Sequence, residues 1–321
     1  MGSLPYVVED LHGILQLFSD GSIYRCQNID FPPFPLEDED GSVEWKDYCY
    51  DKLHDLHLRI YKPKSITTKL PVINYLHGGG FCVGSFAWPH VHNLCLRMSS
   101  SLDAIVVATD YRLAPEHRVP SALDDSLCAL KWLQGCCDDH HVINNVDCFD
   151  FDRVFIIGDS SGGNIAHHLA VRLGPGSSEL TPIKIRGYVM LAPFFGGTKR
   201  TKSEEQGLPE KFLNMDTIDT FWRMSLPVGK TTDHPFANPF GPNSPSLELV
   251  KLDPILIIAG ENEVLKDRVK LYAQRLKELG KIARYVEFQG KEHGFLFDEP
   301  HCKASESLFN LIKDFMVEFS S

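Results

Sequence analysis

The sequence lacks the marks of several large protein classes. Its longest apolar stretches, such as residues 105–108 and 255–259, are far shorter than the roughly 20 residues that cross a bilayer, so we expect no membrane segment. Acidic residues outnumber basic ones by 43 to 32, and the formal net charge is −11. This charge excludes a general attraction to nucleic acid or to an anionic membrane surface. Residues 1–6 show no basic stretch followed by an apolar run, so we expect no secretory signal there.

Motifs for metals and nucleotides are also missing. Nine cysteines are scattered from Cys26 to Cys302 without a CxxC pair, which favours reduced thiols and a cytoplasmic location, with the nucleus as an alternative. No HExxH run marks a metal site. The run Gly-Lys-Thr at 229–231 could end a Walker loop, but Met224 stands where its first glycine must be. We therefore expect neither a metal nor a cofactor.

What the sequence does contain is a strand–helix rhythm that begins near residue 55. Compact apolar runs predict strands at 56–61, 70–76, 104–108, 154–157, 185–191, 255–259 and 283–288. Helical spacing predicts helices at 90–101, 121–133, 164–173, 265–279 and 308–319. Strands that alternate with helices indicate an α/β fold whose central sheet is mostly parallel and flanked by helices on both faces.

Two segments interrupt this rhythm. Residues 1–50 are irregular, Pro-rich and acidic, and we predict an N-terminal arm or cap that precedes a main domain at 51–321. Residues 198–245 are rich in Gly, Pro and Asn and fall between predicted strands. Such an insertion is either a cap over the site or a packed surface excursion without ligand contact.

The strongest chemical signal is the run Gly-Asp-Ser-Ser-Gly-Gly at 158–163, which contains the pattern G-x-S-x-G. It directly follows a predicted strand and directly precedes a predicted helix. In that context the pattern is typical of a nucleophile elbow, a tight turn that exposes a serine hydroxyl. The positions around it must be small because two backbones pass close together. We therefore predict Ser160 as a nucleophile, rather than as part of an ordinary Gly-Ser loop.

A second glycine cluster follows the predicted strand 70–76. Residues 77–81 read His-Gly-Gly-Gly-Phe, and three glycines let main-chain N–H groups approach a substrate oxygen. We predict that two of these N–H groups, with the N–H of Ser161, hold the charge of a tetrahedral intermediate. A flexible turn or a phosphate loop is the alternative, but the lysine of a phosphate loop is missing.

A serine nucleophile needs a base and an acid to orient that base. Fourteen histidines compete for the role of base, and His293 fits because it follows a late predicted strand. The acid should lie after the strand 255–259, where the chain offers Glu261, Glu263 and Asp267. Spacing does not choose among the three. Asp267 also falls on the first turn of a helix, where it can simply offset the helix dipole.

Together these motifs resemble a known family. The runs at 77–81 and 158–163, with Asp-Tyr-Arg-Leu-Ala-Pro-Glu-His at 110–117 between them, resemble the hormone-sensitive-lipase-like branch of the α/β-hydrolases. The plant carboxylesterases are its most similar members, and the strigolactone-hydrolysing group among them resembles nearly the whole chain. The segments that carry this closer likeness are 9–13, 56–59, 85–92, 158–171, 187–197 and 291–295.

The resemblance implies roles for individual residues. Ser160 and His293 match the family's nucleophile and base, and Glu263 takes the place of an acid that is usually Asp, with Asp267 as the alternative. Gly79, Gly80 and Ser161 match its oxyanion donors. Five aromatic residues are candidate liners of an apolar pocket, although each could equally lie in the core: Phe81, Trp88, Phe194, Phe195 and Phe295.

The function that the resemblance implies is hydrolysis of an ester or lactone of a small apolar molecule, in particular strigolactone catabolism. Two alternatives stay open. One is an enzyme of plant specialised metabolism that hydrolyses, transfers or cyclises another scaffold. The other is a hormone-binding protein of the gibberellin-receptor type, without catalysis. The only partner we expect is the substrate, bound by a monomer or a homodimer, and neither nucleic acid nor membrane.

Overall fold

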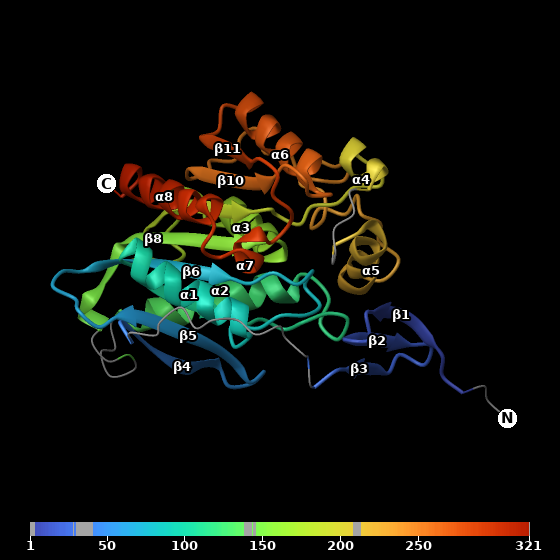
Figure 1. Cartoon of the computed structure of the whole chain (residues 1–321), viewed down its shortest axis with the longest axis horizontal. Coiled ribbons are helices and arrows are strands. Elements are labelled where there is room, and N and C mark those ends of the chain that lie inside the picture. The colour runs from blue at the N-terminus through green and yellow to red at the C-terminus, as the bar shows by residue number, and fades with distance from the viewer. Residues whose placement is uncertain are drawn as a thin grey trace.

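The structure, a computed structural model, describes residues 4–27, 29, 41–137, 143, 146–207 and 213–320. Residues 30–40 of the predicted arm and 208–212 of the predicted insertion lie outside this description. A large twisted sheet with helices on both sides forms the body of the molecule, and a small three-stranded sheet lies beside one end of it (Figure 1). Within the described residues, no helix is both long enough and apolar enough to span a bilayer.

The main sheet has eight strands in the order β11-β10-β9-β8-β6-β7-β5-β4. Neighbours from β11 to β7 run parallel, whereas β5 pairs antiparallel with both β7 and β4. The strands are β4 (Val43–Asp51), β5 (Leu56–Pro63), β6 (Leu70–Leu76), β7 (Ile105–Thr109), β8 (Phe149–Asp159), β9 (Ile185–Leu191), β10 (Ile255–Gly260) and β11 (Ala283–Phe288). The predicted α/β class with a mostly parallel sheet is confirmed.

Helices cover both faces because the inner strands are apolar on both sides. Side chains of α1 (Pro89–Leu102) and α8 (Lys303–Glu318) share one apolar cluster with one face of the sheet. Side chains of α2 (Ser121–Gly135), α3 (Ser161–Arg172) and α6 (Lys266–Glu278) share the other. Because the strands from β11 to β7 run parallel, their carboxyl ends lie at the same edge of the sheet. Binding sites of such sheets form at this edge.

The predicted boundary at residue 50 is wrong, because β4 pairs along its whole length with β5 and belongs to the main sheet. The separate N-terminal unit is smaller. It consists of β1 (Val7–Leu11), β2 (Leu15–Phe18) and β3 (Ile23–Arg25). The sequence pattern missed β4 because its side chains alternate only weakly: most are exposed or half-buried on this edge strand.

The insertion carries α4 (Lys202–Gln206) and α5 (Met215–Ser225), and both are anchored. Glu204 of α4 forms a buried ion pair with Arg268 of α6, and the Arg268 guanidinium also donates to the carbonyls of Gly196, Gly197 and Lys199. Helix α5 in turn holds the N-terminal sheet, since Arg223 pairs with Glu9. The insertion thus connects the small sheet to the main body (Figure 1).

Candidate active site

Ser160 occupies the turn between β8 and α3 that the sequence predicts. Its φ of 51° and ψ of −116° place it in a strained conformation that side-chain-bearing residues rarely adopt. Hydrogen bonds fix this backbone: Ser160 N–H donates to the Leu191 carbonyl (2.8 Å), and the Ser160 carbonyl accepts from Phe194 N–H (2.8 Å). The strain is therefore held by β9 and the segment that follows it.

The glycines of the turn are required by space. A Cβ on Gly158 would lie 2.2 Å from the Gly162 carbonyl oxygen, and a Cβ on Gly162 would lie 2.0 Å from the Leu76 carbonyl oxygen. Both obstacles are backbone atoms of neighbouring elements, so they cannot rotate away. The predicted need for small residues around the elbow is confirmed.

The glycine loop after β6 lies next to the elbow. Gly79 (φ 110°), Gly80 (φ 59°) and Phe81 (φ 64°) follow one another with positive φ, which turns the loop back on itself. The Gly79 carbonyl closes the turn by accepting from the N–H groups of Cys82 and Val83 at 3.0 Å. A Cβ on Gly80 would lie 2.3 Å from the Phe221 ring of α5, so the insertion packs directly against this loop.

Buried polar contacts support the loop from behind. Tyr111 donates to the His77 carbonyl (2.7 Å), and its ring stacks on the His77 imidazole with centroids 4.3 Å apart. His77 Nε2 lies 3.6 Å from Asp110 Oδ1, and burial raises the pKa of the Asp110 carboxyl. Asp110 itself accepts from Ser85 Oγ (2.8 Å) and Phe86 N–H (2.7 Å). The start of the glycine loop is therefore fixed by the residues of the 110–117 run.

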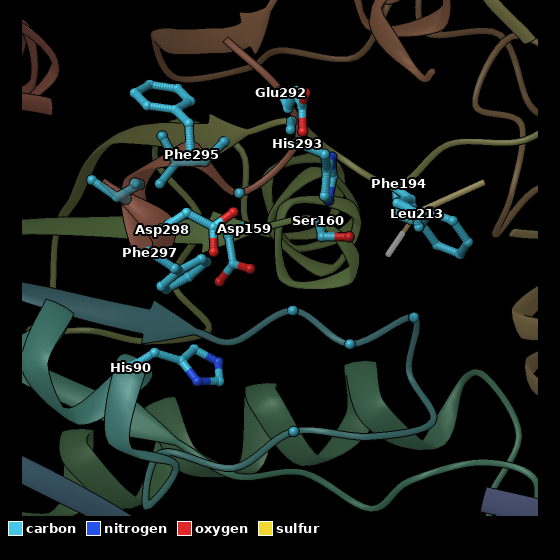
Figure 2. A pocket seen from close by; sticks show the side chains of 18 of the residues that line it. His90, Asp159, Ser160, Phe194, Leu213, Glu292, His293, Phe295, Phe297 and Asp298 are labelled. Atoms are coloured by element: carbon cyan, nitrogen blue, oxygen red, sulfur yellow. The ribbon is translucent and has the colours of Figure 1, made fainter. Parts of the chain in front are cut away.

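His293 and Glu263 form the pair that a serine nucleophile needs. His293 Nδ1 lies 2.9 Å from Glu263 Oε2, and Glu263 is fully buried. Its other oxygen, Oε1, accepts from Gly260 N–H (3.1 Å). Figure 2 shows the His293 imidazole pointing toward the Ser160 side chain, which lies directly below it. Asp267 does not take part in this pairing: its Oδ2 accepts from Ser203 N–H (2.8 Å) in α4, so it serves the anchoring of the insertion.

The pair meets because the loops after β10 and β11 are tied together. The strands are in register from Ile255 opposite Ala283 to Gly260 opposite Phe288. Beyond them, Asn262 N–H donates to the Lys291 carbonyl (2.8 Å), and Gly290 N–H donates to Glu261 Oε2 (2.8 Å). Glu261, one of the three candidate acids, therefore has a structural role.

A cavity of about 490 Å³ opens over these residues, and Ser160, His293, Glu263, Gly79 and Gly80 line it. Most of the remaining lining is apolar and comes from distant parts of the chain, including the N-terminal unit, the insertion and α7 (Phe295–Asp298). Its apolar members outside the glycine loop include Ile14, Ile29, Trp88, Leu213, Phe221 and Phe297. The cavity is thus suited to a small, largely apolar ligand.

Three of the five predicted aromatic liners, Trp88, Phe194 and Phe295, do line the cavity. The other two, Phe81 and Phe195, lie in the core and are each 2% exposed. Phe81 leaves the glycine turn toward Trp222, and Phe195 packs against Tyr272. The prediction is wrong for these two because neighbouring positions around a tight turn point in different directions.

The sequence patterns missed the polar lining residues Asp159, Glu292, Asp298 and His90. Asp159 accepts from the Tyr75 hydroxyl, and burial raises the pKa of its carboxyl. Burial, with the neighbouring His77, lowers the pKa of the His90 imidazole to about 4. Position offers a signal for two of them, since Asp159 and Glu292 directly precede the nucleophile and the base.

Comparisons with known proteins agree with this fold. The family described as having an α/β hydrolase fold matches residues 73–297. A probable carboxylesterase 6 of Arabidopsis thaliana is 39% identical over 73% of this chain and 69% of its own, and carboxylesterase 20 of that plant is 34% identical over 98% of each. The crystal structure of a thermostable carboxylesterase cloned from a metagenomic library is 29% identical, covers 87% of this chain and 90% of its own, and superposes with a TM-score of 0.73.

Relatives that are named for other functions match at similar levels. A 2-hydroxyisoflavanone dehydratase of Glycyrrhiza echinata is 33% identical over 96% of this chain and 95% of its own. A gibberellin receptor of Arabidopsis thaliana is 35% identical over 78% of this chain and 68% of its own. The matching family, the eight-stranded sheet and the elbow nevertheless agree on one assignment: the chain belongs to the α/β-hydrolase fold family, and several of its relatives are plant proteins named carboxylesterase.

Proposed function

We propose that the protein is a serine carboxylesterase that hydrolyses an ester or lactone of a small, mostly apolar molecule. The observation that carries the proposal is the Glu263–His293 hydrogen bond of 2.9 Å at the wall of a cavity that Ser160 also lines. A serine without a paired imidazole is a poor nucleophile at neutral pH. Here the pair is complete, and the strained elbow presents the hydroxyl to the cavity.

The proposed reaction has two halves. Ser160 Oγ attacks the carbonyl carbon while His293 Nε2 accepts the hydroxyl proton, and the carbonyl electron pair moves onto oxygen. The N–H groups of Gly79, Gly80 and Ser161 stabilise that oxyanion, and each such donor is worth about 3 kcal/mol. The intermediate collapses as His293 returns the proton to the leaving oxygen. Water then loses a proton to His293, attacks the acyl carbon, and releases the acid and the restored serine.

Glu263 orients the base in this scheme. A carboxylate that accepts from Nδ1–H leaves the lone pair of Nε2 free to take the serine proton, and it stabilises the imidazolium that forms. Glutamate is one methylene longer than the aspartate usual in the family. The fully buried carboxylate reaches His293 while its second oxygen is fixed by Gly260, so the extra length is accommodated by the loop.

For the substrate we propose strigolactones, cleaved so that the butenolide ring separates from the tricyclic lactone, in the cytoplasm. Two observations support this choice. The wider sequence resembles the strigolactone-hydrolysing plant carboxylesterases in segments spread over nearly the whole chain. The cavity of about 490 Å³ is mostly apolar, which suits an uncharged lactone.

Hormone binding without catalysis is the second candidate, because one relative is named as a gibberellin receptor. Binding alone needs no paired base, whereas this chain holds His293 against Glu263. That pairing favours catalysis over binding alone.

One experiment tests both levels of the proposal. The protein and its Ser160→Ala variant are incubated with a panel of strigolactones, gibberellin methyl ester and simple nitrophenyl esters, and product masses are recorded. We expect release of the butenolide and loss of all turnover in the variant. Nitrophenyl ester hydrolysis without strigolactone cleavage would reject the substrate but keep the esterase. Full activity of the variant would reject the mechanism.

A further inference from the structure

Arg25, the last residue of β3, ties the N-terminal unit to the end of the glycine loop. Its guanidinium pairs with both carboxylate oxygens of Glu116, at 2.8 and 2.6 Å. The same group donates to the carbonyls of Cys82 and Ala114, each at 2.7 Å. Cys82 directly follows the glycine loop, and the other two acceptors lie on the 110–117 run. One side chain of a separate unit thus contacts two segments that frame this loop.

These contacts are of two kinds. The ion pair is partly exposed, since the side chains of Arg25 and Glu116 are 28% and 36% accessible. Ion pairs of this type contribute little to stability. Cys82 and Ala114, in contrast, are fully buried. A buried carbonyl that loses its donor must find another one, so loss of the guanidinium would force these two peptide groups to move.

The Cys82 carbonyl is connected to the oxyanion site through rigid peptide groups. It shares a planar group with Val83 N–H, which donates to the Gly79 carbonyl at 3.0 Å. The Gly79 carbonyl in turn shares a group with the N–H of Gly80, a proposed oxyanion donor. Both peptide bonds are trans, so the carbonyl and the N–H of each group point in opposite directions. The direction of the Gly80 N–H therefore depends on the Cys82 carbonyl, which Arg25 holds.

The Ala114 contact supports the same loop from a second direction. Ala114 N–H donates to the Phe81 carbonyl at 2.8 Å. The Phe81 carbonyl shares a peptide group with Cys82 N–H, which also donates to the Gly79 carbonyl at 3.0 Å. Both N–H groups that hold the Gly79 carbonyl are thus connected to Arg25, one directly and the other through Ala114.

We propose that Arg25 is a positioning residue for the oxyanion site: its guanidinium holds two buried carbonyls so that the Gly80 N–H points at the substrate oxygen. The inference rests on the proposed esterase function and extends it, because it gives the N-terminal unit a role in the chemical step. Ile14 of that unit lines the cavity, whereas Arg25 is not among the described lining residues. Its effect should therefore appear in transition-state stabilisation rather than in substrate binding.

The test measures kcat and KM separately for 4-nitrophenyl acetate and 4-nitrophenyl hexanoate. Arg25→Met removes every donor of the side chain at similar volume. We expect kcat to fall at least about tenfold for both esters, because loss of one oxyanion donor lowers kcat about 10²- to 10³-fold and a misdirected donor loses part of that. KM should change less than about threefold. Arg25→Lys should recover part of kcat, since one ammonium can donate to one of the two carbonyls.

Inhibition gives a readout that a change in the cavity wall would not produce. A hexyl trifluoromethyl ketone adds to Ser160 Oγ and places a negative oxygen at the oxyanion site, whereas hexyl methyl ketone binds mainly as the intact ketone. We expect Arg25→Met to weaken inhibition by the trifluoromethyl ketone by about the factor lost in kcat/KM. Inhibition by the methyl ketone should weaken less than about threefold. Equal weakening of both ketones would assign the effect to the wall and overturn the proposal.

Two control variants separate positioning from attachment of the N-terminal unit. Glu9→Gln weakens another ion pair of this unit, the one with Arg223 of α5. Glu116→Gln weakens the exposed pair but leaves the carbonyl contacts of Arg25 in place. We expect both controls to keep kcat within about threefold of wild type, as is usual for exposed ion pairs.

Thermal unfolding checks that each variant is folded, and Arg25→Lys replaces Arg25→Met in the comparison if the latter is not. An unchanged kcat in the folded arginine variant would overturn the proposal, as would an equal loss of kcat in Glu9→Gln. If the wild type cleaves no ester in a Ser160-dependent way, the proposed function fails instead, which is a distinguishable result.

Discussion

The most discriminating prediction concerns Glu263→Gln, an isosteric change that removes one acceptor. Both carboxylate oxygens of Glu263 face donors: Oε1 accepts from Gly260 N–H at 3.1 Å, and Oε2 faces His293 Nδ1 at 2.9 Å. A glutamine has one oxygen and one NH2 group. It can therefore accept from only one of these two partners, and its NH2 must face the other.

Each orientation has a definite cost. If the amide oxygen stays with Gly260, the NH2 group faces Nδ1 and selects the imidazole tautomer protonated at Nε2, which cannot accept the Ser160 proton. If the oxygen faces Nδ1, two buried donors oppose each other at Gly260, which costs about 1–3 kcal/mol. We expect kcat to fall about 10³- to 10⁴-fold, because the corresponding acid-to-amide change in a serine protease triad has an effect of about 10⁴.

The assay follows hydrolysis of 4-nitrophenyl butyrate, with thermal unfolding as the check on folding. Asp267→Asn is the matched control, since Asp267 lies just after Glu263 in the chain and its carboxylate accepts from Ser203 N–H of the insertion. We expect that control to keep at least about a third of the activity. The assignment of the acid would be refuted if a folded Glu263→Gln enzyme retained more than a tenth of wild-type kcat. It would also be refuted if the Asp267→Asn enzyme lost its activity.

Three further changes test other parts of the structure. Phe221→Leu trims the ring that covers Gly80 and lines the cavity; we expect kcat/KM for an apolar ester to fall at least about tenfold, and an unchanged value would show that α5 does not shape the site. Arg268→Met leaves the Glu204 carboxylate buried and unpaired, so the free energy of unfolding measured in urea should fall by about 3–5 kcal/mol. The double variant Arg268→Met/Glu204→Gln should recover part of this loss of stability. Equal losses in the single and the double variant would contradict the pairing. Burial raises the pKa of Asp253 to about 6, so folding favours its protonated form and stability falls as pH rises from about 4 through about 6. The melting temperature of Asp253→Asn relative to wild type should therefore increase between pH 4 and pH 7, and a pH-independent difference would exclude the shift.

Much of the catalytic centre is predictable from the sequence because its parts are local. The elbow around Ser160 and the glycine loop at 77–81 are each a short run after an apolar strand, and backbone geometry fixes what such runs do. The position of His293 follows from strand order. In contrast, spacing alone does not choose between Glu263 and Asp267. The family resemblance favours Glu263, and the loop geometry shows that this side chain turns toward His293.

The lining of the cavity is less predictable because it is assembled from separate segments. Ile14 comes from the N-terminal unit, Phe221 from the insertion and Phe297 from α7, which follows the base. No local pattern distinguishes these residues from ordinary core positions. The fate of Phe81 and Phe195 shows the converse: an aromatic residue beside a catalytic motif can point into the core instead of the cavity. The edge strand β4 was missed for a related reason, since partial exposure blurs its alternation.

The contacts of α5 limit how the protein can be modified. Its Phe221 ring rests on the Gly80 backbone, its Arg223 is bonded to Glu9, and its Thr217 hydroxyl lies 3.2 Å from His12 Nε2. A chimera that receives α5 from a relative, but keeps its own first 27 residues, would lose these contacts because the partners of the new helix are missing. A chimera that receives only the N-terminal unit would lose the same contacts, because α5 would then be the unmatched partner. The transfer of substrate preference between relatives should therefore succeed only when α5 and the N-terminal unit are exchanged together.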